Sequence, residues 1–355
     1  MSDDDQLKPI FLPAGVAGPD KRAGYFADAG ASIEALDLSD GKPIWRSEVA
    51  ARPLIVDEKR LAALRALKDQ ANALQVVVLD CADEGALLVE SDLILFPEWV
   101  SAAVVTGEAF RYRVALEGNI LLLEWEAHAR YRGGAPPPRH IQAQATKAES
   151  GIAHIDLKRG KVKMLSAAGR SEVELPPALQ QASLFSYQMG PSDTWETEPW
   201  TVDEKLAAAI TGEIAEEQQA LQLQRWNPKT GKVEQPVELV KGQALVSYVT
   251  PDGAYLFIHS EVGSESSPDA KEPWWLFSVV TGKQMALLGY EQGTREPCVL
   301  ASHVYYIVEN PPPALRSGGE TIQSTLKAVD IVSGQQLWQR SLSPQRTRMR
   351  PALRQ

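Results

Sequence analysis

A phrase of eleven residues occurs near both ends of the chain. It reads ALDLSDGKPIW over residues 35–45 and AVDIVSGQQLW over residues 328–338, with Asp third, Gly seventh and Trp last in each copy. Apolar residues alternate before the Asp and resume after the Gly. Asp and Ser side chains favour a turn by bonding to the local backbone, and Gly adopts the left-handed conformation that a tight turn requires. Each copy therefore predicts a β-strand, a tight turn and a second strand.

Weaker copies of the turn lie between the two ends. They keep the glycine but lack the final tryptophan, and the copy in VVLDCADEGALLV has one extra residue. Longer stretches also repeat, because residues 56–80 align with residues 202–227. A repeated unit of roughly 40–50 residues with four strand-like runs is typical of a β-propeller blade. The six predicted turns carry Gly41, Gly85, Gly160, Gly231, Gly282 and Gly334.

The stretch 57–74 gives a conflicting signal. It is rich in Ala, Leu, Lys and Glu, which favour helix, and a strand–helix–strand order would give an α/β fold with a parallel sheet. Against this alternative, residues 112–132 and 253–262 are strand-like in their aromatic and β-branched content. We therefore expect an all-β fold, a β-propeller of four-stranded antiparallel blades. The turns mark six blades, six or seven are expected in total, and eight is an alternative.

The length of the chain leaves two architectures open. Its 355 residues suit either two domains or one large closed β structure. Because the repeat covers most of the chain, we expect a single propeller domain over residues 1–355. The proline-rich and polar content between turns predicts long loop insertions at about 131–150 and 167–198.

The two complete phrases resemble the tryptophan-docking repeat of the quinoprotein-like (PQQ-type) β-propellers, whose pattern is roughly A-x-D-x-x-[ST/D]-G-x-x-x-W. The resemblance implies that each phrase shapes a turn and docks one blade onto the next, with the first and last blades as neighbours in a ring. The residues to which it gives this structural role are Asp37, Gly41, Trp45, Asp330, Gly334 and Trp338.

The same resemblance raises the question of a quinone cofactor. The dehydrogenases of that family are much longer and carry an adjacent cysteine pair beside the cofactor, whereas Cys81 and Cys298 are far apart in this sequence. The five histidines show no metal-binding spacing, and no G-x-S-x-G, P-loop or G-x-G-x-x-G motif occurs. We therefore expect no cofactor, no metal and no catalytic residue.

Two regions are candidates for binding a partner. Arginine and aromatic residues alternate in FRYR and recur in ARYRGGAPPPRH, where they could hold an acidic peptide or a phosphate group if they share a face. A tryptophan in an acidic loop is a candidate interface anchor. A solvated strand and loop are the alternative for both regions. The candidate residues are Arg111, Arg113, Arg130, Arg132, Arg139 and Trp195.

Charge and composition narrow the choice of partner. The formal net charge is −10, which disfavours nucleic acid and anionic membrane. The opening residues lack the basic and then apolar order of a signal peptide, and no apolar run is long enough to span a membrane. We expect a cytoplasmic, non-enzymatic scaffold that binds a protein. The alternatives are an enzyme or small-ligand binder that uses the central channel, and an envelope assembly subunit resembling outer-membrane propeller lipoproteins.

Overall fold

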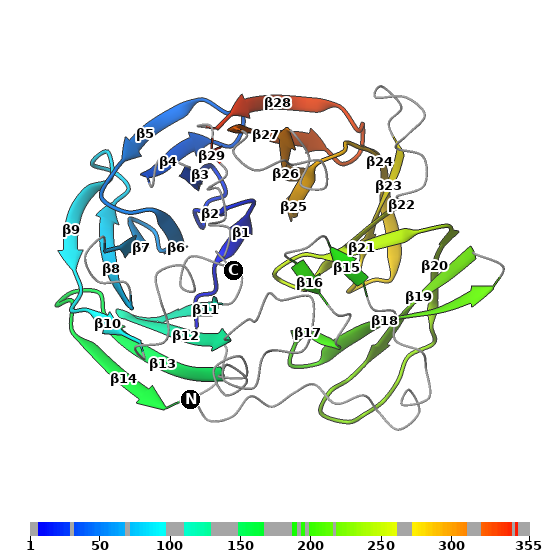
Figure 1. Cartoon of the computed structure of the whole chain (residues 1–355), viewed down its shortest axis with the longest axis horizontal. Helices are drawn as coiled ribbons and strands as arrows, with labels where there is room; N and C mark the ends of the chain where they lie inside the picture. Colours follow the sequence, from blue (N-terminus) through cyan, green and yellow to red (C-terminus); the bar gives the residue numbers. More distant parts are fainter. Residues whose placement is uncertain are drawn as a thin grey trace, which may run out of the picture. The chain divides into compact units, whose positions relative to one another are not determined.

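All the regular secondary structure in the described part of the chain is β-strand. The computed structural model describes residues 6–28, 32–67, 72–96, 110–128, 148–166, 187–189, 193–195, 199–215, 218–260, 272–310, 321–342 and 345–346. Their strands form six antiparallel sheets, each containing a four-stranded meander, and one two-stranded sheet (Figure 1). The fold class is therefore the predicted one, an all-β chain built from β-propeller blades.

Three of the sheets lie in the first half of the chain, and in each the strands follow one another in sequence. The first consists of β1 (Ile10–Leu12), β2 (Gly15–Ala17), β3 (Ala23–Asp28), β4 (Ser32–Asp37) and β5 (Pro43–Ser47). The second consists of β6 (Arg52–Val56), β7 (Arg60–Ala66), β8 (Ala73–Asp80), β9 (Ala86–Glu90) and β10 (Ile94–Leu95), the last two both pairing with β8. The third consists of β11 (Phe110–Glu117), β12 (Ile120–His128), β13 (Ala148–Asp156) and β14 (Val162–Ser166).

The other three sheets lie in the second half and have the same order. The fourth consists of β17 (Trp200–Asp203), β18 (Leu206–Ala215), β19 (Gln218–Trp226) and β20 (Val237–Gly242). The fifth consists of β21 (Leu245–Val249), β22 (Tyr255–Ser260), β23 (Glu272–Ser278) and β24 (Lys283–Tyr290). The sixth consists of β25 (Thr294–Leu300), β26 (His303–Asn310), β27 (Thr321–Asp330) and β28 (Gln336–Ser341), and β29 (Gln345–Arg346) also pairs with β27.

The sheets belong to two compact units. The first unit comprises Met1–Ile10 and Ala14–Arg170, and the second comprises Phe11–Pro13 and Ser171–Gln355. A single domain over residues 1–355 stays a prediction, as does the closure of a ring.

The predicted insertions fall largely outside the described residues. β13 begins at Ala148, inside the predicted insertion 131–150. Within 167–198, β15 (Tyr187–Met189) and β16 (Asp193–Trp195) form the two-stranded sheet.

The helical alternative for residues 57–74 does not hold in the described part of that stretch. β7 occupies Arg60–Ala66 and pairs along its whole length with β8. Leu61, Ala62 and Ala63 are all buried there. Packing on both faces of a central strand outweighs the helical propensity of Ala and Leu, which is a fraction of a kcal/mol per residue.

The six predicted glycines share one turn conformation. Their φ angles lie between 67° and 73°, which is the left-handed region. In each turn the Gly N–H donates to the backbone carbonyl of the residue at, or directly after, the end of the preceding strand. These bonds are Gly41–Asp37, Gly85–Asp80, Gly160–Asp156, Gly231–Asn227, Gly282–Ser278 and Gly334–Asp330. The bond from Gly85 spans five positions rather than four, which accounts for the extra residue in that copy.

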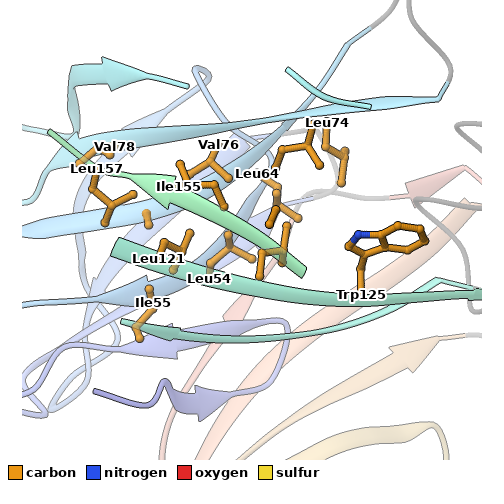
Figure 2. Packing of buried hydrophobic residues seen from close by; sticks show 14 of the residues in the cluster. Leu54, Ile55, Leu64, Leu74, Val76, Val78, Leu121, Trp125, Ile155 and Leu157 are labelled. Carbon is orange, nitrogen blue, oxygen red and sulfur yellow. The ribbon is translucent and has the colours of Figure 1, made fainter. Parts of the chain in front are cut away.

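The hydrophobic core of the first unit lies between successive sheets. Figure 2 shows side chains of the second and third sheets directed toward one another, including Val76 and Val78 from β8 and Leu121 from β12. Ile155 of β13 packs in the same cluster, and all four side chains are 1% exposed or less. Matching clusters join the first and second sheets, the fourth and fifth, and the fifth and sixth.

Candidate interaction surfaces

Trp45 lies between the first two sheets. Its side chain is 8% exposed and packs against the Gly85 turn of the second sheet, where a Cβ on Gly85 would lie only 2.8 Å from Cζ3 of the indole. Its Nε1–H donates to the carbonyl of Cys81 at 3.3 Å, and its ring lies 5.5 Å from that of Tyr25. The Asp37 carboxylate shapes the turn before this strand, because its Oδ1 accepts the Ser39 N–H at 2.8 Å.

The turns at Gly160 and Gly282 also contact the preceding sheet, with different chemistry. A Cβ on Gly160 would lie 2.1 Å from the carbonyl oxygen of Glu90 at the end of β9. At Gly282 the neighbours are Val237 Cγ2 and Arg225 Cζ, at 2.9 and 3.2 Å from the Cβ position. Glycine is therefore required in these turns by close approach as well as by backbone conformation.

Arg225 contacts the turn of the next sheet, as Trp45 does, but through polar bonds. Its Nη1 donates to the carbonyl of Val280 at 2.8 Å and to that of Val279 at 3.3 Å, both at the turn of the next sheet. Its Nη2 pairs with Glu234 at 2.7 Å. Docking between sheets thus uses an indole in one junction and a guanidinium in another.

Trp338 occupies the same position in its sheet as Trp45. Its side chain is 8% exposed, lies opposite Ala328 in register, and its ring centroid is 5.9 Å from that of Tyr305. Asp330 Oδ1 accepts the Ser333 N–H at 2.7 Å, and hydrogen bonds from Ser333 lower the pKa of the Asp330 carboxyl. A Cβ on Gly334 would lie 4.0 Å from Cδ2 of Leu288 on β24. The adjacency of the Trp45 and Trp338 blades stays a prediction.

The arginine-rich candidate residues fall on and beyond β11. Arg113 is exposed on this strand and lies opposite Glu124 of β12 in register, while Arg111 lies opposite Glu126. These neighbours on β12 are acidic. Arg130, Arg132 and Arg139 lie outside the described residues. The backbone of Trp195 ends β16.

Four outermost strands share a feature that the sequence interpretation did not single out. A β-bulge in each leaves one extra residue unpaired, directly before or close to the tryptophan position of the repeat. The extra residue is apolar and exposed in every case. The four are Ile44 at 53%, Leu88 at 49%, Met285 at 42% and Leu337 at 45% exposed. The sequence signal was present, because an apolar residue holds the tenth position of both complete phrases.

Further exposed apolar side chains border these bulges. Leu87 on β9 is 40% exposed, and Leu287 on β24 is 58% exposed. Val280 and Val332, at the turns of the fifth and sixth sheets, are 54% and 89% exposed. The outer strands and turns therefore present apolar side chains to solvent.

Three titratable groups of the fifth and sixth sheets are hydrogen-bonded to one another. Glu291 accepts the Lys327 ammonium at 2.5 Å and the Tyr306 hydroxyl at 3.0 Å. Burial raises the pKa of Tyr306.

The neighbouring crevice, which Trp274 also lines, has a volume of about 50 Å³. Sites for drug-sized ligands are several times larger, so this crevice is too small for an organic cofactor.

His259 and both cysteines lie in largely buried positions. His259 stacks on Tyr290 with ring centroids 3.8 Å apart, and burial lowers its pKa to about 4. Burial raises the pKa of the Cys81 thiol to about 11 and that of Cys298 well above its usual range, so both are poor nucleophiles at neutral pH. The described residues contain no group of three or more His, Cys, Asp or Glu side chains that could hold a metal ion. No helix among them is long and apolar enough to cross a membrane.

Comparisons with known proteins give structural matches only. No protein-family model matches the chain, and no curated protein matches it. The designed Ika8 protein aligns at 11% identity and a TM-score of 0.37, covering 94% of this chain and 90% of Ika8. AztD from Citrobacter koseri aligns at 11% identity and 0.37, covering 91% and 96%. BamB from Moraxella catarrhalis aligns at 12% identity and 0.26, covering 90% and 80%. The similarities are too distant to assign a family or a function.

Proposed function

We propose that this protein is a non-enzymatic scaffold of the PQQ-type repeat class that binds a protein partner in the cytoplasm through its outer strands. The observation that carries the proposal is the bulge shared by four sheets. It exposes one large apolar side chain on each of the outermost strands β5, β9, β24 and β28.

The β-bulge determines which groups of an outer strand are available to a partner. A bulge interrupts the regular row of backbone donors and acceptors, so it discourages another strand from pairing along that edge. The exposed side chain is then the group available for contact. Burying apolar surface contributes roughly 25 cal/mol per Å², so a fully buried Met or Leu adds about 1.5–3 kcal/mol to binding. Several such residues on a rigid sheet provide the apolar centre of an interface.

The test is recovery of a partner from native lysate by three forms of the tagged full-length chain. One form, called the rim variant, replaces two exposed apolar side chains of the outer strand β24 through Met285→Ser and Leu287→Ser. The control is Gln284→Ser, an exposed polar residue on the same strand. Far-UV circular dichroism and thermal unfolding establish that all three forms are folded.

We expect the wild type and the control to retain the same protein and the rim variant to lose it. Equal recovery by all three forms would place the binding surface elsewhere. A preparation that retains no protein but converts a small molecule would refute the scaffold function itself.

A further inference from the structure

The outer strand of the fifth sheet, β24, has a small residue at the position that tryptophan occupies in β5. Trp45 lies opposite Ala35 in register. In the fifth sheet the two sizes are exchanged, because Ala286 lies opposite Leu276. Ala286 follows Gly282 by the same number of positions as Trp45 follows the glycine of its own turn. The fifth sheet therefore has no indole at this position to dock onto the turn of the sixth sheet.

A crevice remains beside that turn. A Cβ on Gly85 would lie 2.8 Å from the docked indole, whereas the nearest described atom to a Cβ on Gly334 is Cδ2 of Leu288, at 4.0 Å. Gly334 and Leu288 both line the crevice of about 50 Å³. It lies between β24 and the turn before β28, the two outer strands that carry the exposed bulge residues Met285 and Leu337. The crevice is therefore part of the proposed binding surface.

The polar side chains that line the crevice have unused bonding capacity. Trp274 is 2% exposed, and among the described residues none accepts a hydrogen bond from its Nε1–H. Glu291 accepts Lys327 at one carboxylate oxygen and Tyr306 at the other, and each oxygen can accept a second bond. The exposed Gln336 has a side-chain amide that bonds to no described residue. The crevice thus offers a donor, acceptor sites and an amide that can act as either.

Charge and size restrict the group that fits there. The Lys327 ammonium, 2.5 Å from Glu291, already balances the carboxylate, so a second cation would have no free counter-charge and an anion would be repelled by Glu291. An apolar group would leave the Trp274 N–H unpaired. A volume of about 50 Å³ holds roughly two or three bonded heavy atoms, since one water takes about 30 Å³ in the liquid. A primary carboxamide is neutral, has three heavy atoms, and both donates and accepts.

We propose that this crevice binds the carboxamide of an Asn or Gln side chain of the partner protein. The inference rests on the proposed scaffold function and deepens it by naming a polar group that the partner places among the apolar contacts. The amide oxygen accepts the Trp274 N–H, and the amide nitrogen donates to Glu291. A few polar groups in an otherwise apolar site fix the orientation of what binds there.

The probe is propionamide, a carboxamide on a two-carbon stem, added to the full-length chain labelled with ¹⁵N-glycine. Gly289 and Gly334 line the crevice, so their backbone amide signals in two-dimensional NMR spectra report its occupation. Propionate and propylammonium are charged probes of similar size. Butanone has a similar shape and accepts a hydrogen bond, but it cannot donate one.

We expect propionamide to shift both glycine signals saturably, with a dissociation constant on the order of 10 mM for so small a ligand. Propionate and propylammonium should bind at least about tenfold more weakly, because neither finds a free counter-charge beside Lys327 and Glu291. Butanone should bind about fivefold more weakly, because it loses the bond to Glu291. The absence of a saturable shift with propionamide, or equal binding of a charged probe, would overturn the proposal.

Variants test whether the probe occupies the crevice. Gln336→Ala removes an amide of the lining and should weaken propionamide binding about fivefold. The matched control is Gln335→Ala, which truncates the exposed neighbour that does not line the crevice and should have no effect. The double variant Leu276→Ala, Ala286→Trp recreates the pairing of Trp45 in β5 and should abolish binding, because the indole fills the crevice. Equal propionamide affinity of the wild type and Gln336→Ala would refute the site even where the double variant does not fold.

Partner recovery separates this inference from the scaffold function. The rim variant keeps the crevice, so it should bind propionamide as the wild type does while it loses the lysate partner. Gln336→Ala should retain less of the partner than Gln335→Ala does. If these two variants retain the partner equally while the rim variant loses it, the scaffold function stands and the carboxamide site is refuted.

Discussion

The contact between Trp45 and the Gly85 turn gives the sharpest stability prediction. Trp45 is 8% exposed, touches the glycine backbone and bonds through Nε1 to the Cys81 carbonyl at 3.3 Å. Truncating a buried Trp to Ala costs about 3–5 kcal/mol, because the transfer free energy is lost and a cavity remains. The long hydrogen bond adds little to this value. We therefore expect Trp45→Ala to lower the free energy of unfolding by about 4 kcal/mol.

A double-mutant cycle isolates the contact itself. Gly85→Ala should cost about 2–3 kcal/mol in the wild type, because φ is 73° and the new Cβ would lie 2.8 Å from the indole. In the Trp45→Ala background the clash is gone, and only the backbone strain of about 1 kcal/mol remains. The two substitutions should therefore couple by more than 1 kcal/mol.

Guanidinium unfolding followed by far-UV circular dichroism measures all four forms, because this signal does not depend on the removed tryptophan. Ile44→Ala, which truncates the exposed neighbour on β5, is the control and should change stability by less than about 0.5 kcal/mol. A loss below about 1 kcal/mol for Trp45→Ala, or additivity within the cycle, would refute the docking of Trp45 on Gly85.

Two further predictions use the same unfolding assay. Gly282→Ala should lower the free energy of unfolding by about 2–3 kcal/mol, because the new Cβ would lie 2.9 Å from Val237. Gly231 has a similar φ but no described atom within 4 Å of its Cβ position, so Gly231→Ala should lower it by only about 1 kcal/mol. Equal losses in the two variants would contradict the close approach at Gly282. The pKa of His259 falls from an ordinary value of about 6.5 to about 4, so the unfolded chain takes up its proton first as the pH falls. The contribution of His259 to the free energy of unfolding should be fully present above about pH 6.5 and should decrease by up to about 3 kcal/mol as the pH falls toward 4. The His259→Phe variant should lose this part of the pH dependence while it keeps the ring stack on Tyr290. An unchanged pH profile in that variant would refute the buried neutral state of His259.

The turns could be predicted from sequence because their determinants are local. An Asp, Asn or Ser that begins the turn and a Gly in the left-handed region four or five residues later are enough to place all six, and the described residues form a four-stranded sheet at each of those places. The strand β7 could not be predicted with the same ease, because it depends on burial in the tertiary structure and the composition of residues 57–74 does not reveal that burial. A helical propensity was present there, but it is small compared with burial on two faces of a sheet.

The candidate surfaces were less predictable because they depend on register. Whether Ile44 is paired or bulged is decided by how β5 aligns with β4, and one residue of slip would reverse the faces of the strand.

The central functional claim is that exposed apolar side chains on the outer strands bind a protein. Isothermal titration calorimetry of the recovered partner with the wild type and with the Met285→Ser, Leu287→Ser variant tests it most directly. Losing two buried side chains should weaken binding at least tenfold and make the heat-capacity change of binding less negative, because less apolar surface leaves water. The same affinity and the same heat-capacity change for both forms would contradict the claim.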